Sequence, residues 1–95
     1  MSIRIGIGNS LVPGLAPDGI WQWAEACDEW GIDSLWVSDQ PSGTAPEPLA
    51  MLAALAARTR RLRLGTNVLV ISMREPVLLA RQLSTIHALR EGRLL

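Results

Sequence analysis

Short apolar runs at nearly equal intervals predict the strands of this chain. Isoleucines alternate with polar or small residues over 3–7, which predicts a first strand with one buried face. The apolar run 34–37 predicts a second strand, and the alternating stretch 63–71 predicts a third. Residues 93–95 look like the beginning of a fourth. The strand centres are therefore about 29 or 30 residues apart, the length of one strand-plus-helix unit.

Amphipathic helices fill the intervals between these strands. Apolar residues recur at helical spacing within 17–31, 47–57 and 75–91. Gly31 stands just past the end of the first of these, where glycine is favoured, and Pro48 and Pro76 suit first helical turns. A loop at 9–14 is predicted between the first strand and its helix.

This alternation predicts an α/β fold with a parallel sheet and right-handed crossovers. Such a sheet is completed either as a doubly wound sheet or as an eight-stranded barrel of about 250 residues. Three units and the beginning of a strand leave one edge unpaired and one sheet face uncovered. We therefore expect residues 1–95 to be one incomplete domain, the N-terminal portion of a longer protein.

Composition narrows the functional classes. The nine acidic and nine basic residues balance, so we expect no nucleic-acid partner and no anionic membrane partner. Cys27 is the single cysteine, which excludes an internal disulfide and fits a reducing, cytoplasmic setting. The longest apolar run, 49–57, is far shorter than the roughly 20 residues of a membrane span. His87 is the single histidine, and we expect no metal site.

Polar residues at the ends of the predicted strands are the candidates for chemistry. Thr66 and Asn67 interrupt an otherwise apolar strand, and Asp39 and Gln40 follow the second strand. Buried polar groups need partners, and ligands of parallel α/β sheets bind at the carboxyl ends of the strands. Arg74 could bind a phosphate or an acidic side chain, and we interpret it as pairing with a neighbour such as Glu75 or capping a loop.

Five stretches, in order, resemble the luciferase-like monooxygenase superfamily. They are 31–39 (GIDSLWVSD), 48–59, 63–68 (RLGTNV), 74–80 (REPVLLA) and 92–94. The resemblance implies a TIM-type (β/α)8 barrel about three times as long as this chain. It also implies an oxidoreductase that acts on a small organic substrate. The cofactor would be the deazaflavin coenzyme F420, used in hydride transfer, or reduced flavin (FMN), used in monooxygenation.

The resemblance further implies which residues contact the cofactor. These are Asp39, Gln40, Thr66, Asn67 and Val68, with a non-proline cis peptide between Asn67 and Val68. Gln40 stands where the deazaflavin branch commonly has histidine. Glutamine donates and accepts hydrogen bonds but does not transfer a proton, so no catalytic residue is assigned.

Other features favour ordinary structural roles. We interpret the four tryptophans as core or interface fillers and Cys27 as inert packing. The arginines of 58–63 lie at the opposite end of the third strand from the expected site, and we interpret them as a solvated face. As an alternative to the enzyme, the chain would be a non-catalytic truncated barrel fragment or an assembly module. Such a module would bury its open edges against another chain, for example in a homo-oligomer.

Overall fold

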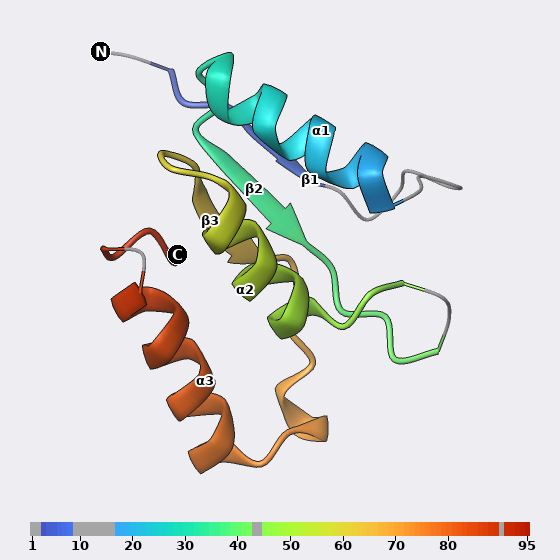
Figure 1. Ribbon diagram of the computed structural model, residues 1–95. Helices are drawn as coiled ribbons and strands as arrows, with labels where there is room; N and C mark the ends of the chain where they lie inside the picture. Colours follow the sequence, from blue (N-terminus) through green and yellow to red (C-terminus); the bar gives the residue numbers. More distant parts are fainter. Residues whose placement is uncertain (1–2, 9–16, 43–44, 90) are drawn as a thin grey trace.

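The computed structural model describes residues 3–8, 17–42, 45–89 and 91–95. Three parallel strands lie side by side, and each is followed along the chain by a helix (Figure 1). The elements, in chain order, are β1 (Gly6–Gly8), α1 (Pro17–Glu29), β2 (Ser34–Val37), α2 (Pro48–Arg58), β3 (Arg63–Thr66), the short 3-10 helix η1 (Ile71–Met73) and α3 (Pro76–Leu89).

The order of the strands in the sheet follows their order in the chain, β1-β2-β3. The register places Leu35 opposite Ile7 and Leu64, and all pairs are parallel. Leu94 adds a parallel bridge to Leu64, as expected for the beginning of a fourth strand. An uninterrupted order of three parallel strands occurs in a barrel and also in one half of a doubly wound sheet, whose order reverses at the switch point between its halves.

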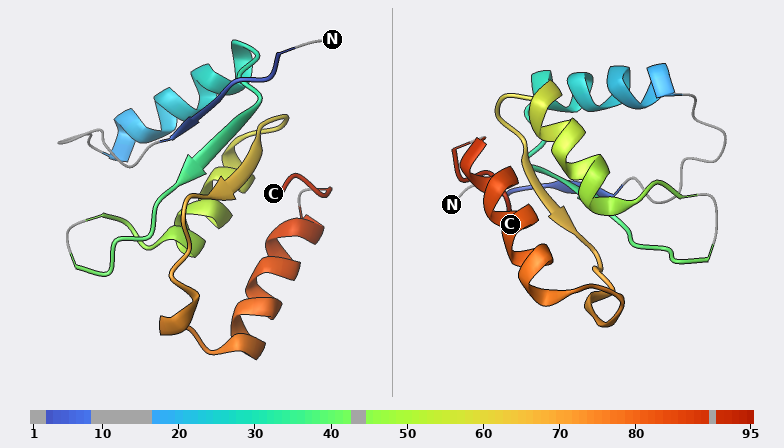
Figure 2. Two further views of the ribbon diagram at one scale, coloured as in Figure 1. Left: turned by 180° about the vertical axis from the view of Figure 1, so that it is seen from behind. Right: turned by 60° about the horizontal axis from the view of Figure 1, so that its bottom comes forward.

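Helices α1 and α2 cover one face of the sheet, and α3 packs beside α2. The views in Figure 2 show α1 and α2 over one side of the strands, with the strands in front when the molecule is seen from behind. Helix α2 is the centre of this layer, because it contacts β2, β3, α1 and α3. The buried core lies between this layer and the strands; it consists of Ala24, Cys27, Leu35, Val37, Leu49, Leu52, Leu55, Ala56, Leu62, Leu64 and Ile86.

Local sequence explains where the helices begin and end. Glu47 caps α2 through a 2.8 Å hydrogen bond from the Ala50 N–H, and Pro48 follows it at the first helical position. Glu75 accepts in the same way from the N–H groups of Val77 and Leu78 at the start of α3. Gly31 ends the turn after α1 with φ = 83°, a conformation that glycine adopts without steric cost.

Two polar clusters join the elements at the end of the sheet where the strands begin. The Asp28 carboxylate, at the end of α1, accepts hydrogen bonds from the N–H groups of Arg60, Arg61 and Leu62 at 2.7–2.9 Å. Arg93 donates to the carbonyl oxygens of Leu62, Ala56 and Thr59. The first cluster connects α1 to the turn before β3, and the second closes the end of α2.

Several expectations about these elements need correction. The third strand ends at Thr66 and does not continue to Ile71, because the chain turns after Thr66 into bends and η1. The first strand is confined to Gly6–Gly8, and the predicted loop 9–14 lies outside the described residues. Trp30 is 78% exposed and fills no core, since α1 has already ended at Glu29.

The arginines of 58–63 are only partly a solvated face. Arg61 binds the carbonyl oxygens of Cys27, Asp28 and Ile32, and Arg63 forms a 2.7 Å ion pair with Asp33. Arg58 is the most solvated of the paired members: it contacts Glu25 and stacks over the Trp21 ring.

Candidate functional site

The segments that follow β2 and β3 are joined by hydrogen bonds, and we call them together the mouth (residues 38–40 and 67–70). The Asn67 N–H donates to the Val37 carbonyl at 2.8 Å. The Ser38 hydroxyl donates to the Asn67 carbonyl at 3.0 Å, and the Asp39 N–H donates to the Val68 carbonyl at 3.2 Å. These bonds continue the pairing of β2 with β3 past the last regular strand residues.

The peptide bond between Asn67 and Val68 is cis. The resemblance predicted a cis bond at this position, and this prediction is confirmed. Both residues are exposed, with Val68 at 67% of its full accessibility. Hydrogen bonds from Ser38 and Asp39 hold the carbonyl groups on either side of the bond.

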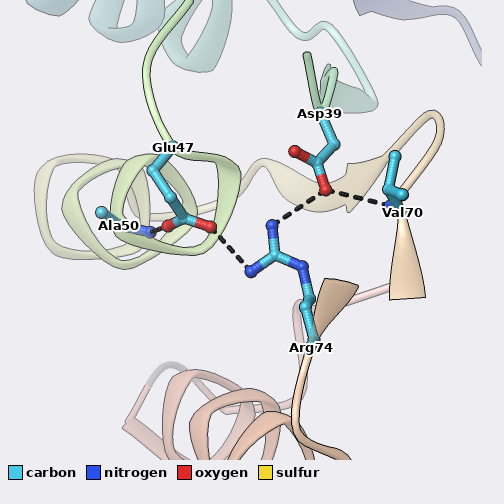
Figure 3. A network of polar contacts seen from close by, with 5 residues as sticks. All are labelled: Asp39, Glu47, Ala50, Val70 and Arg74. Carbon is cyan, nitrogen blue, oxygen red and sulfur yellow. Dashed lines mark hydrogen bonds and ion pairs between the residues drawn. The ribbon is translucent and has the colours of Figure 1, made fainter. Parts of the chain in front are cut away.

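Asp39 is bound from two sides. Its Oδ2 atom accepts from the Val70 N–H at 3.0 Å and from an Arg74 NH2 group at 2.8 Å, and the Asp39 side chain is only 9% exposed (Figure 3). The second terminal nitrogen of Arg74 binds Glu47 at 2.8 Å. One guanidinium therefore joins the segment after β2, the start of α2 and the segment after β3. We call this set of three side chains the clamp.

The charges of the clamp stabilise one another. The hydrogen bond from Arg74, supported by the Val70 N–H, lowers the pKa of Asp39 below its ordinary value. Burial opposes ionisation of Glu47, but the hydrogen bonds from the Ala50 N–H and from Arg74 outweigh it and lower the Glu47 pKa. The hydrogen bond to Asp39 raises the pKa of Arg74 further. All three groups are charged at neutral pH.

Arg74 binds acidic side chains, as one of the alternatives predicted, but its partners are Asp39 and Glu47, so the interpretation that it pairs with its neighbour Glu75 is wrong. Glu75 instead caps α3, and Arg74 reaches across to Asp39 and Glu47. Its Nε atom is buried and has no hydrogen-bond partner among the described residues. Sequence reasoning missed this clamp because its members are far apart along the chain. The acidic residues at strand and helix ends were the available signal.

The structure places the five predicted cofactor contacts differently from one another. Asn67 and Val68 lie exposed in the mouth, and the Gln40 side chain is exposed next to Asp39. Thr66 is opposite Val37 in the register, and register partners share a face of the sheet. Val37 is buried under the helices, so the Thr66 side chain belongs to the covered face and only its backbone borders the mouth.

Within the described part of the chain, no group of three or more histidine, cysteine or carboxylate side chains is arranged to hold a metal ion. None of the described helices combines the length and the apolar character that a membrane span requires.

Parallel strands in chain order, helices on one face and a polar mouth at the carboxyl ends are the features of a β/α protein, the class in which ligand sites lie at that end of the sheet. The comparison with family models is specific: residues 1–95 match the luciferase-like monooxygenase model. The chain belongs to the luciferase-like monooxygenase family.

Relatives of known activity include dehydrogenases and a monooxygenase. An F420-dependent glucose-6-phosphate dehydrogenase from Amycolatopsis mediterranei is 36% identical over 86 residues, which cover 83% of this chain and 26% of that enzyme. The 4-hydroxyprotoasukamycin monooxygenase of Streptomyces nodosus subsp. asukaensis is 36% identical over 102 residues, covering 95% of this chain and 27% of that enzyme. The chain thus spans about a quarter of the length of these relatives.

Solved structures agree with the fold. The monooxygenase RslO1 from Streptomyces bottropensis superposes with a TM-score of 0.81 at 30% identity, covering 97% of this chain and 31% of its own. The oxygenating constituent of 3,6-diketocamphane monooxygenase from Pseudomonas putida, solved in complex with FMN, gives 0.81 at 24% identity, covering 98% of this chain and 28% of its own. The expected fold class, a portion of a TIM-type (β/α)8 barrel, is confirmed.

Proposed function

We propose that this chain forms the cofactor-binding first part of an F420-dependent oxidoreductase that transfers hydride to or from a small organic substrate. Membership of the luciferase-like family supports an oxidoreductase, and the F420-dependent relatives at 35–42% identity support the deazaflavin. The observation that carries the proposal is the exposed Asn67–Val68 backbone, held in place at the carboxyl ends of β2 and β3. Reduced flavin with monooxygenation is the alternative chemistry, supported by the monooxygenase relative.

The residues of the mouth fit a planar, weakly polar ring. Val68 offers an exposed apolar side chain, and Asn67 and Gln40 offer amide donors and acceptors. When bound, a deazaflavin accepts or donates hydride at C5, chemistry that no protein side chain supplies. In this proposal Asn67, Val68 and Gln40 contact the cofactor by their side chains and Thr66 by its backbone.

In this proposal Asp39 supports the shape of the mouth in addition to contacting the cofactor. One of its carboxylate oxygens is already occupied by Val70 and Arg74. Asp39 therefore holds the shape of the mouth with that oxygen and has Oδ1 for the cofactor. Gln40 orients the ring by hydrogen bonding and transfers no proton, so the proton donor or acceptor of the reaction is another group.

The proposal is tested by titrating the complete native protein with F420 and, separately, with FMN, and by following the absorbance and fluorescence of each ring. We expect F420 to bind about 10-fold more tightly than FMN or better, which corresponds to about 1.4 kcal/mol. Asn67→Ala and Gln40→Ala should weaken F420 binding. Gln22→Ala, an exposed glutamine on α1, is the matched control and should not. Tight FMN binding without F420 binding would overturn the deazaflavin, and binding of neither would overturn a cofactor site.

A second candidate is the assembly module without turnover of its own. The helix-free face of the sheet favours it, because a sheet of a β/α protein is normally covered on both sides. Size-exclusion chromatography with light scattering separates the two. A folded oligomer that binds neither cofactor would favour the module, whereas a species that binds F420 in equal molar amount would contradict it.

A further inference from the structure

One side chain dominates the helix-free face of the sheet. Leu35 and Leu64 point to the helices, so their neighbours along each strand point away from them. On the helix-free side the described strands carry Gly6 and Gly8 in β1, Ser34 and Trp36 in β2, and Arg63 and Gly65 in β3. Barrel interiors are usually filled by branched aliphatic side chains. In place of such side chains, this face has glycine, serine and one large flat ring from the middle of the strands to their carboxyl ends.

The Trp36 indole lies across all three strands. Its Nε1 atom donates to the Ser34 hydroxyl at 2.9 Å. A Cβ atom on Gly6 would come within 2.6 Å of Nε1, and a Cβ atom on Gly65 within 2.6 Å of Cζ3. The pyrrole end of the ring therefore rests against β1 and the benzene end against β3. We call this arrangement the indole plate.

Gly6 and Gly65 are required by the space that the indole occupies and not by their backbone conformations. Among the described glycines only Gly31 and Gly92 have a positive φ, so the conformations of Gly6 and Gly65 are open to other residues. Space favours glycine at both positions, since a methyl group at 65 would collide with the indole and one at 6 with both the indole and the Ser34 hydroxyl that is bonded to it. Two positions in separate strands are thus kept small so that one ring can lie flat.

The indole plate lies next to the mouth, one pair of strand residues closer to the middle of the sheet. Trp36 is two residues before Ser38, whose hydroxyl binds the Asn67 carbonyl, and Gly65 is two residues before Asn67. Trp36 is only half-buried, although its neighbours Leu35 and Val37 are 0% and 2% exposed. The indole offers a flat face beside small neighbours, and aromatic faces stack against planar rings.

We propose that Trp36 is a ligand-contacting residue whose indole forms the floor on which the planar ring of the cofactor rests. This inference rests on the proposed function. The ring would be held between the indole plate below and the Asn67–Val68 backbone at its side. Stacking of a base or ring on an aromatic side chain contributes about 1–3 kcal/mol, which corresponds to about 5- to 150-fold in affinity.

The test compares Trp36→Leu and Trp36→Phe with Trp30→Leu in the complete native protein, by F420 titration and by thermal unfolding. Trp30 is the matched control because it is 78% exposed and lies outside the core. We expect Trp36→Leu to weaken F420 binding about 10-fold or more, Trp36→Phe to weaken it less, and Trp30→Leu to leave it unchanged. Affinities of both Trp36 variants equal to that of the unmodified protein would overturn the inference.

A second measurement follows the Trp36 side chain itself as the cofactor is added. The protein is labelled with 5-fluorotryptophan, and the Trp36 fluorine signal is assigned from Trp36→Phe. Saturation with F420 should shift the Trp36 signal and leave the Trp30 signal in place. An unmoved Trp36 signal in a protein that binds F420 would overturn the inference and leave the proposed function standing. A protein that binds neither F420 nor FMN would overturn both.

Discussion

Asp28 offers a sharp test of how the elements are held together. Its carboxylate accepts three backbone N–H groups, from Arg60, Arg61 and Leu62. The Leu62 side chain is fully buried and its N–H is partly shielded, so losing a charged acceptor there costs about 1.5–3 kcal/mol. The exposed N–H groups of Arg60 and Arg61 regain water, and together they contribute less than about 1 kcal/mol. Asp28→Ala should therefore lower the free energy of unfolding by about 2–3 kcal/mol.

Urea unfolding followed by far-UV circular dichroism measures this loss, provided that the dependence on urea concentration is unchanged. Asp28→Asn keeps one oxygen that can accept from Arg61 and Leu62, and it should lose about 1 kcal/mol. The control is Glu29→Ala, an exposed neighbour on α1, which should change stability by less than about 0.5 kcal/mol. Equal stabilities of Asp28→Ala and Glu29→Ala would refute the reasoning.

The same carboxylate carries a pH dependence of known sign. Burial acts to raise the pKa of Asp28, but the three backbone N–H groups and Arg61 outweigh it and lower that pKa below the usual value of 3.8. A lowered pKa in the folded state gives stability that is complete above the usual value and is lost as the pH falls through the lowered one. Asp28→Ala should remove this part of the acid sensitivity.

Three further predictions concern the clamp and the core. The amide signal of Val70 should titrate with Asp39, with a midpoint below 3.8, and a midpoint at or above 3.8 in the native protein would contradict the bond to Arg74. Arg74→Lys replaces the planar guanidinium, which binds two carboxylates, with a single ammonium group. The pH midpoint of the Val70 amide signal should therefore rise toward 3.8. Arg58→Lys, at the solvated ion pair with Glu25, is the control and should leave this midpoint unchanged. Leu55→Ala should destabilise the protein by about 2–5 kcal/mol because Leu55 is fully buried. Leu89→Ala, at a residue that is 74% exposed, should destabilise it by less than about 0.5 kcal/mol. Similar shifts in the thermal unfolding midpoint for the two variants would show that Leu55 does not belong to the core.

Features set by local sequence could be predicted well. The strand Ser34–Val37 has the predicted bounds, and Glu47 and Pro48 begin α2 as their side chains require. Apolar spacing, a capping carboxylate and an early proline all act within one helical turn, so a reader of the sequence has the whole cause in view.

Features set by distant partners could not be predicted in this way. The run Val68–Ile71 is apolar and continues the pattern of a strand, yet β3 ends at Thr66. Bonds to Val37, Ser38 and Asp39 take up the backbone of Asn67 and Val68, and nothing near these residues in the sequence indicates them. The cis bond was anticipated from the resemblance, and the physical chemistry of the residues alone gave no sign of it. The clamp is a similar case, because its members come from three separate segments.

The indole plate restricts the order in which substitutions can accumulate. A Cβ atom at position 6 or 65 would lie 2.6 Å from an atom of the indole, which is closer than van der Waals contact allows. A larger residue is therefore excluded at either position while tryptophan is present at 36. A smaller residue at 36 removes the ring from both positions, and at position 6 the Ser34 hydroxyl, 2.5 Å from a Cβ atom placed there, must turn away as well. A lineage must therefore lose the ring before either strand neighbour can gain a side chain, and a return to tryptophan requires that both be glycine again. Substitutions at positions 6, 36 and 65 are therefore coupled during evolution, although the three residues lie in different strands.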